Sequence, residues 1–406
     1  MAHEVDGKKT DQNAPNMATK ITHGGRRPEW TGAVVNPPVW RASTHLYENV
    51  AAQKSGVKSD SDTKFFYGRR GSPTQWALSD ALTDMEAGAH GTLLFPSGVA
   101  AISCALMALL NPGDVLMMSD NAYDPSRAFA NGTLKRMGIE TRFYKPMDTQ
   151  DVIAQMCGKT RVILLESPGS LTFEVQDVPA ICAAAKERGI ATILDNSWAT
   201  SYFFPAIEKG VDISMLAGTK YIVGHSDVMM GSLTSTEKYW KKLRQTAREF
   251  GQIFSPDDAY LALRGLRTMA VRLDQHEKSA LKIATWLEQQ SRVIKVLHPA
   301  LASCPGHEIW QRDFKGSSGL FSFILDGNEE QAEAFVDALS LFGIGYSWGG
   351  FESLALLTHP EKHRSATHWP KNGEAEQSGA VIRLHIGLED IDDLIADLAN
   401  AFKNMP

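Results

Sequence analysis

From about residue 72 onward, short apolar runs alternate with stretches of helical periodicity, and this alternation strongly limits the possible folds. Strands separated by helices pair in parallel, because each helix returns the chain across the sheet. We therefore expect an α/β domain with a mainly parallel sheet and helices on both faces. The predicted strands are Thr92–Phe95, Val115–Met118, Arg161–Leu165, Ile190–Leu194 and Val211–Leu216, and helices are predicted at Gly98–Leu110 and Val178–Arg188.

The pattern changes beyond about residue 257. A long, charged, helical stretch is predicted over Pro256–Gln290, and strands are predicted at Phe321–Leu325 and Val381–His385. Fewer strands with flanking helices favour a smaller α+β domain. We accordingly divide the chain into an N-terminal arm (1–71), an α/β domain (72–266) and a C-terminal α+β domain (267–406).

Composition narrows the possible partners. The chain has 41 Lys and Arg against 47 Asp and Glu, a net charge of −6, which argues against nucleic acid or an anionic membrane surface as partner. Residues 91–113 carry no charge, but Pro96 divides them into a strand and a helix, each too short to span a membrane. Four widely spaced cysteines and the lack of an export signal at the N-terminus predict a reducing, cytoplasmic location.

A metal site is not expected. The cysteines have no zinc-ligand spacing. His359 and His363 are four residues apart, as ligands on a helix can be, but Pro360 and the polar surroundings favour a surface loop.

Two residues that can carry chemistry follow apolar strands. Asp195 ends one strand and Lys220 closely follows another, and ligands of parallel sheets bind at the carboxyl ends of the strands. A structural salt bridge would also explain this pair. Ser97 precedes the helix predicted from Gly98, where unpaired backbone N–H groups favour a phosphate, although an ordinary N-cap is the simpler explanation.

Tyr123 lies just past the strand predicted at Val115–Met118. Its ring could cover a flat ligand there, or it could simply pack against its neighbours. A phosphate cradle, an aromatic ring, a carboxylate and a lysine at adjacent strand ends suit one cofactor, pyridoxal phosphate. In that arrangement the lysine forms a Schiff base and the carboxylate keeps the pyridine nitrogen protonated.

Several segments resemble the Cys/Met metabolism family of pyridoxal-phosphate enzymes, and the resemblance extends from about residue 20 to the C-terminus. These segments are Tyr67–Thr74, Glu166–Gly169, Asp195–Ala199, Ser214–Tyr221 and Gly224–Asp227. The resemblance implies the aspartate-aminotransferase-like fold, fold type I, with a seven-stranded sheet. Three segments are similar to the bacterial β-lyase branch and differ from the γ-lyases and γ-synthases, namely Tyr67–Gly71, Tyr346–Leu354 and Arg383–Asp390.

The resemblance also implies a role for each site residue. Lys220 would form the Schiff base and move protons, Asp195 would pair with the pyridinium nitrogen, and Tyr123 would stack on the ring and take part in catalysis. The phosphate would be bound by Gly98, Val99 and Thr219, joined by Tyr67 and Arg69 of a neighbouring subunit. The substrate carboxylate would be bound by Ser347, Trp348, Arg383 and Tyr67, with the arginine offering a planar fork.

The implied activity is β-elimination from L-cystathionine to homocysteine, pyruvate and ammonia, with side activity on cystine or cysteine. A homotetramer of dimers with shared active sites is implied as well. Two positions depart from the family pattern: Ala217, where many relatives have serine, and Phe351, where tyrosine is expected. A γ-lyase, a transsulfuration synthase, a desulfhydrase and a non-enzymatic binding protein are the alternatives.

Overall fold

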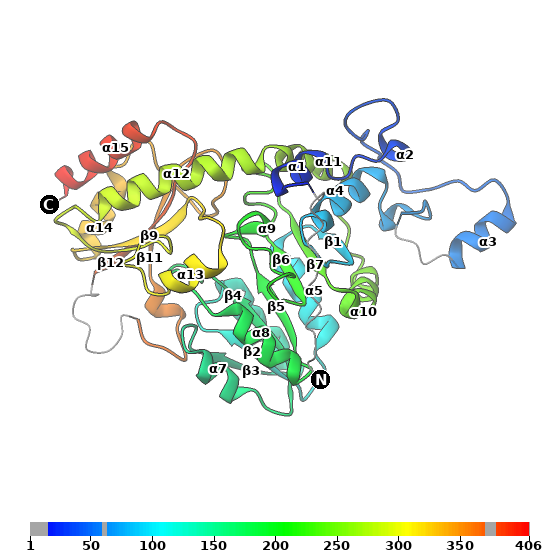
Figure 1. Cartoon of the computed structure of the whole chain (residues 1–406), viewed down its shortest axis with the longest axis horizontal. Helices are drawn as coiled ribbons and strands as arrows, with labels where there is room; N and C mark the ends of the chain where they lie inside the picture. The colour runs from blue at the N-terminus through cyan, green and yellow to red at the C-terminus, as the bar shows by residue number, and fades with distance from the viewer. Residues whose placement is uncertain (1–14, 59–62, 370–378, 406) are drawn as a thin grey trace, which may run out of the picture.

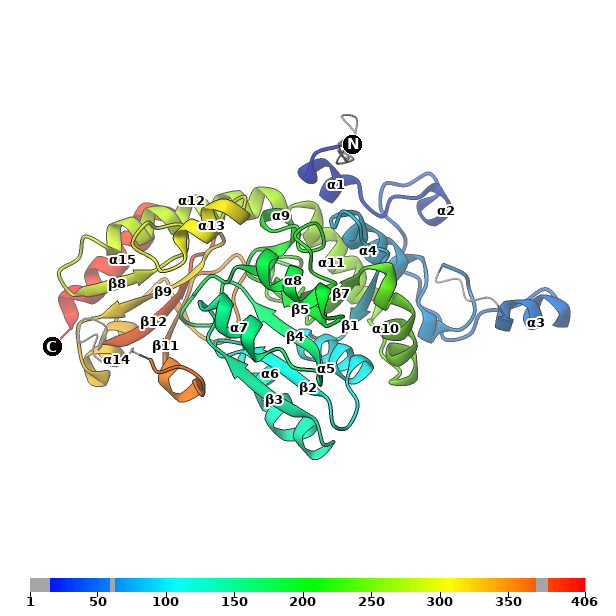
Figure 2. The ribbon, with the colours of Figure 1, turned by 60° about the horizontal axis from the view of Figure 1, so that its bottom comes forward.

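Two β-sheets organise the computed structural model, which describes residues 15–58, 63–369 and 379–405 (Figures 1 and 2). The larger sheet has the strand order β1-β7-β6-β5-β4-β2-β3, and β7 runs antiparallel to both of its neighbours while the other pairs are parallel. Its strands are β1 (Gly91–Phe95), β2 (Val115–Ser119), β3 (Glu140–Tyr144), β4 (Thr160–Glu166), β5 (Ala191–Asp195), β6 (Ile213–Leu216) and β7 (Gly231–Ser235).

Helices cover both faces of this sheet, which explains its continuous apolar strands. Within β2, Val115 and Met117 belong to one buried cluster, while Leu116 and Met118 belong to another on the opposite face. The helices are α4 (Pro73–Asp84), α5 (Gly98–Leu109), α6 (Asp124–Phe129), the π-helix η2 (Ala130–Leu134), α7 (Thr149–Gln155), α8 (Val178–Glu187), α9 (Thr200–Phe203), α10 (Glu237–Glu249) and α11 (Pro256–Arg267). The predicted α/β class with a mainly parallel, seven-stranded sheet is confirmed.

The second sheet has five strands in the order β10-β11-β12-β9-β8 and packs against helices on one side. Its strands are β8 (Val293–Leu297), β9 (Leu320–Leu325), β10 (Gly343–Ile344), β11 (Leu354–Thr358) and β12 (Ala380–His385). The helices of this part are α12 (Met269–Leu287), α13 (His307–Asp313), α14 (Glu329–Asp337), the 3-10 turn η3 (Pro360–His363) and α15 (Ile391–Asn404).

The helical stretch predicted over Pro256–Gln290 is helical in the structure over Pro256–Arg267 and Met269–Leu287. The stretch forms two helices, α11 and α12, because the backbone leaves helical geometry at Thr268 (φ −107°, ψ 6°). Arg272 stabilises this break: its Nε donates to the Thr268 hydroxyl and its Nη2 to the carbonyl of Gly265.

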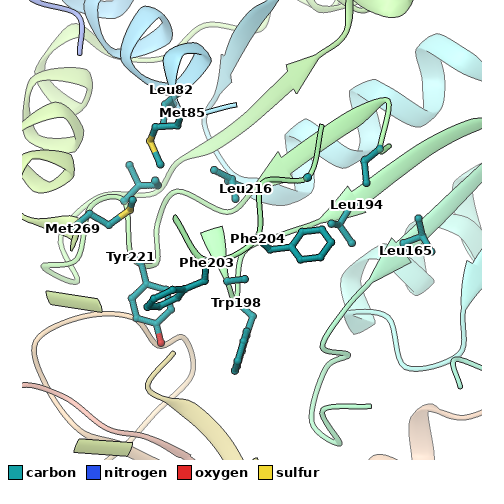
Figure 3. Close-up of a cluster of buried hydrophobic side chains, with 14 of the residues drawn as sticks. Leu82, Met85, Leu165, Leu194, Trp198, Phe203, Phe204, Leu216, Tyr221 and Met269 are labelled. Atoms are coloured by element: carbon teal, nitrogen blue, oxygen red, sulfur yellow. The ribbon is translucent and has the colours of Figure 1, made fainter. Parts of the chain in front are cut away.

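A buried cluster joins the two sheets (Figure 3). The indole N–H of Trp198 donates to the carbonyl of Leu320 on β9 at 2.8 Å. The Tyr221 hydroxyl accepts the backbone N–H of Gly319 at 3.0 Å. These two bonds therefore fix the residues that follow β5 and β6 to the start of β9.

The part of the N-terminal arm around α3 (Val50–Lys58) extends away from the rest of the chain (Figure 1), whereas α1 (Met17–His23) packs against α4 and α11. The arm also contains α2 (Pro28–Thr31) and the 3-10 turn η1 (Gly68–Arg70). It exposes apolar side chains, with Leu46 at 93% and Val35 at 62%. Among the helices that the structure describes, none has the length and apolarity needed to cross a membrane. The two boundaries between the three predicted domains stay predictions.

Candidate active site

One cavity of about 300 Å³ lies at the carboxyl ends of β4, β5 and β6, and all but two of the predicted site residues line it. The parallel strands explain this convergence, since their carboxyl ends meet at one edge of the sheet. The predicted residues found there are Gly98, Val99, Tyr123, Asp195, Thr219, Lys220, Ser347, Trp348 and Arg383. Segments far apart in the sequence thus contribute to one cavity, which we call the catalytic pocket.

Lys220 lies in the turn that follows β6. Its Nζ donates to the hydroxyl of Ser347 at 2.6 Å and lies 5.2 Å from the centre of the Trp348 ring. Burial, aided by the positive charge of Arg383, lowers the pKa of Lys220 to about 8, while Asp195 acts in the opposite direction. A neutral, nucleophilic amine is therefore accessible close to neutral pH, as a Schiff-base lysine requires.

Two carboxyl groups end neighbouring strands in the pocket. Glu166 of β4 and Asp195 of β5 are register partners. Burial raises the pKa of Asp195, and burial together with Asp195 raises the pKa of Glu166 well above its usual range. The backbone N–H of Ser197 orients Asp195 by donating to its Oδ1 at 3.0 Å. Such a pair of buried acids is suited to a ligand that brings a positive charge to Asp195.

Glu166 has a second contact that fixes Tyr123. The backbone N–H of Tyr123 donates to Glu166 Oε2 at 2.7 Å, at the start of α6. The Tyr123 side chain is 45% exposed and lines the pocket, which is the placement expected of a ring that covers a flat ligand. Sequence reasoning gave Glu166 no role, although its position at the end of a strand, like that of Asp195, was a signal.

The N-terminus of α5 forms a tight cradle at the pocket. Ser97 Oγ accepts the N–H of Ala100 at 3.1 Å, so the predicted N-cap is confirmed. The first N–H groups of the helix, at Gly98 and Val99, have no partner within an α-helix and suit an anion. A Cβ on Gly98 would lie 2.9 Å from the Cβ of Ala217, so the cradle has no room for a larger residue.

Thr219, the third predicted phosphate ligand, lies beside this cradle with its hydroxyl engaged. Its Oγ1 accepts the N–H of Met230 at 2.8 Å and donates to the Met230 carbonyl at 3.1 Å. In this arrangement the helix N-terminus remains the main anion-binding element of the pocket.

Arg383 on β12 lines the same pocket as Lys220. Its Nη2 donates to the carbonyl of Ser347 at 3.2 Å, and burial lowers its pKa to about 10, which leaves it cationic at neutral pH. Ser347 has a positive φ of 78°, and Gly349 follows with 85°. A Cβ on Gly349 would lie 2.9 Å from the backbone of Lys220, so only glycine lets this turn approach the lysine.

Tyr67 and Arg69 are the two predicted residues that do not line the catalytic pocket of their own chain. Arg69 Nη1 donates to the carbonyl of Arg248 at 2.6 Å, and Tyr67 is 48% exposed. Both lie at the inner end of the N-terminal arm.

The two departures from the family pattern are also visible. Ala217 lines the catalytic pocket with a methyl group where a serine would add a hydroxyl, and its backbone N–H donates to Ser197 Oγ. Phe351 is 53% exposed. In the described part of the chain no group of three or more His, Cys, Asp or Glu could hold a metal ion.

These groups fit pyridoxal phosphate. The N-terminus of α5 suits its phosphate, the depressed pKa of Lys220 suits its aldehyde, and Asp195 suits a pyridinium nitrogen. Fold and pocket together define a pyridoxal-phosphate-dependent enzyme.

Comparison with known proteins identifies the family. The model of the Cys/Met metabolism PLP-dependent enzymes matches residues 18–403, and the chain belongs to this family. It is 44% identical to the cystathionine beta-lyase MetC of Escherichia coli K12, over 95% of the chain and 98% of that protein. It is 39% identical to an L-alanine/L-glutamate racemase of Wolbachia pipientis wMel, over 92% of the chain and 93% of that protein.

Among solved structures, MetB from Corynebacterium glutamicum superposes with a TM-score of 0.87 at 30% identity, over 97% of this chain and 100% of that one. The family-level predictions of fold, cofactor and enzyme class are confirmed.

The low pKa of Lys220 gives a first prediction. In cofactor-free protein, trinitrophenylation of Lys220 should rise through about pH 8, because the amine is protonated and unreactive below its pKa and neutral above it. Arg383→Ala removes a repelling charge, raises this pKa and shifts the profile to higher pH. Quantitative mass spectrometry of the Lys220 peptide measures the rate. Asp392→Asn, a surface control, should keep the wild-type profile, and identical profiles for Arg383→Ala and wild type would refute the coupling.

Proposed function

We propose that this chain is a carbon–sulfur β-lyase that cleaves L-cystathionine to homocysteine, pyruvate and ammonia. The observation that carries the proposal is the convergence of Lys220, Asp195 and Arg383 in one pocket. The 44% identity to a cystathionine beta-lyase over almost the whole chain supports the choice of substrate.

Arg383, Lys220 and Asp195 would each have a separate role in this reaction. Arg383 would bind the α-carboxylate of the substrate through its guanidinium fork, since it is cationic and fixed by Ser347. The neutral amine of Lys220 would take the proton from Cα, which it can do because burial lowers its pKa to about 8. Asp195 would hold a positive charge on the nitrogen that faces it. Pyridoxal phosphate, when bound, supplies the ring that withdraws electrons from Cα.

Loss of the Cα proton lets the Cβ–sulfur bond break with its electron pair leaving on sulfur. Homocysteine leaves once that sulfur is protonated, and water then converts the remaining three-carbon unit to pyruvate and ammonia. Trp348 packs beside the Lys220 amine and helps to exclude water from it. A γ-lyase must in addition remove a proton from Cβ, and a racemase must return the proton to Cα, so the products distinguish these alternatives.

The product test is direct. Purified wild-type protein given L-cystathionine should release pyruvate and homocysteine in equal amounts, and Lys220→Ala should lower this rate by at least roughly a thousandfold. Lys186→Ala, a change of an exposed lysine on α8, serves as the control. Cysteine with 2-oxobutyrate, or racemised substrate without cleavage, would contradict β-elimination.

We also propose that two subunits share each site and that such dimers form a homotetramer. Tyr67 and Arg69 lie outside the catalytic pocket of their own chain, and the arm that carries them exposes apolar side chains such as Leu46 and Val35. Burying such side chains against a second copy is favourable. In the partner's pocket Arg69 would bind the phosphate, and Tyr67 both phosphate and substrate.

Mixing of inactive variants tests whether two subunits share each active site. Lys220→Ala and Arg69→Ala should each be nearly inactive, because each lacks one part of every site. In a hybrid dimer one of the two sites receives both wild-type residues, so random co-assembly of equal amounts should restore about a quarter of wild-type activity. Mixing Lys220→Ala with Asp195→Ala, both from the same side of the site, is the matched control and should restore none. Absence of rescue in the first mixture would refute the shared site.

The side activity on cystine or cysteine, the cytoplasmic location and the lack of nucleic-acid or membrane partners stay predictions.

A further inference from the structure

A second cavity of about 410 Å³ adjoins the catalytic pocket. The two share Tyr123, Ser170, Leu171, Tyr346 and Arg383 as lining residues, so they lie side by side. We call this cavity the vestibule. Neither the family roles nor the proposed chemistry uses the residues that distinguish it from the catalytic pocket.

The vestibule joins an apolar wall to charges of both signs. Leu356 and Leu357 of β11 contribute the apolar part, Asp124 and Lys362 contribute the charges, and His363 contributes an imidazole. His363 Nδ1 lies 2.9 Å from Asp124 Oδ1, and Lys362 makes no ion pair with any described residue. A zwitterionic group with a short apolar stem would find a partner for each of its parts here.

The position of the charges relative to Arg383 also suits such a ligand. Leu356 is the register partner of Arg383, and β11 then leads outward to His359 and the η3 turn that carries Lys362. Three residues of extended chain from Leu356 to His359 cover roughly 10 Å. An extended thioether amino acid with a second amino-acid end spans about the same distance.

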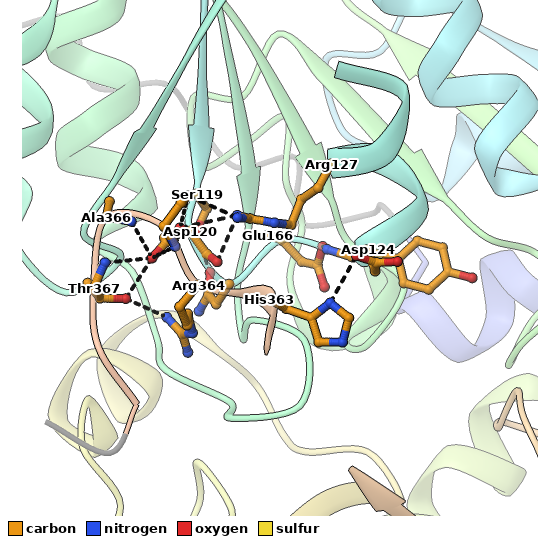
Figure 4. Close-up of polar contacts among 12 residues, drawn as sticks. Ser119, Asp120, Asp124, Arg127, Glu166, His363, Arg364, Ala366 and Thr367 are labelled. Atoms are coloured by element: carbon orange, nitrogen blue, oxygen red, sulfur yellow. Dashed lines mark hydrogen bonds and ion pairs between the residues drawn. The ribbon is translucent and has the colours of Figure 1, made fainter. Parts of the chain in front are cut away.

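The wall that carries Lys362 and His363 is rigidly held (Figure 4). The fully buried carboxylate of Asp120 accepts the backbone N–H groups of Ser365 and Thr367, at 2.9 and 2.7 Å, and also binds Arg127. Beside it, the almost fully buried Arg364 pairs with Glu174 at 2.7 Å. The residues that directly follow Lys362 and His363 are thus fixed by hydrogen bonds, and a preorganised wall lowers the cost of binding.

We propose that the vestibule binds the distal amino-acid end of the thioether substrate, with Asp124 accepting from its ammonium group and Lys362 and His363 donating to its carboxylate. The inference rests on the proposed function and extends it from the reacting end of the substrate to the other end. Asp124, Lys362 and His363 are then residues that determine specificity: they select thioethers that carry a second charged end over simple S-alkyl cysteines.

Two substrates distinguish binding of the distal end from reaction at the Cβ–S bond. L-Cystathionine has the distal amino-acid end, whereas S-ethyl-L-cysteine keeps the reacting Cβ–S bond and ends in an ethyl group. In the holoenzyme, kcat/KM for each is measured by pyruvate release in wild type, Asp124→Asn and Lys362→Ala. The control is Asp392→Asn, which alters a similarly exposed ion pair, with Lys282, on the C-terminal helix α15.

The ratio of kcat/KM for L-cystathionine to that for S-ethyl-L-cysteine should fall roughly tenfold in each vestibule variant, the effect of losing one charge-assisted hydrogen bond. It should stay at the wild-type value in the control. A ratio unchanged in both vestibule variants, with wild-type elimination intact, would overturn the vestibule alone. Wild-type protein that releases pyruvate from neither substrate would overturn the proposed function and the vestibule with it.

Discussion

The parallel pairing of β4 with β5 places two carboxyl groups side by side in a buried pocket, and the rest of the site is arranged around them. Glu166 and Asp195 are register partners, and both have a raised pKa because burial disfavours their charge. Arg383 and Lys220 supply the opposing charges in the same pocket. A cationic ring nitrogen at Asp195 is the natural complement of this arrangement, which links the fold to its cofactor.

Much of the fold could be predicted because helical and strand periods alternate so regularly in the first half of the chain. The strands that end at Asp195 and just before Ala217 were predicted from sequence alone, and with them the edge of the sheet where Lys220 lies. β7 was missed because its residues, Gly231–Ser235, are small and polar and carry no strong strand signal. The break at Thr268 is bound by Arg272, which also donates to the carbonyl of Tyr221, a residue of a distant segment that the local pattern does not predict.

The sequence predicted less about contacts between distant segments. Arg383 and Ser347 were assigned through the family resemblance, since no local pattern tells that β12 and the turn before Gly349 reach Lys220. The hydrogen bonds from the backbone of residues 365 and 367 to Asp120 join segments almost 250 positions apart. Neither segment has a sequence pattern that predicts this contact. Glu166 was placed in a family motif but given no role, because its effect on Asp195 depends on strand register.

The central claim is that Lys220 is the lysine to which the cofactor is bound. Borohydride reduction of the holoenzyme fixes a Schiff base as a stable secondary amine, and peptide mass spectrometry then locates the pyridoxyl group. The account predicts one modified peptide per chain, the peptide that contains Lys220. A pyridoxyl group on a different lysine, or no modification in protein that has bound the cofactor, would contradict it.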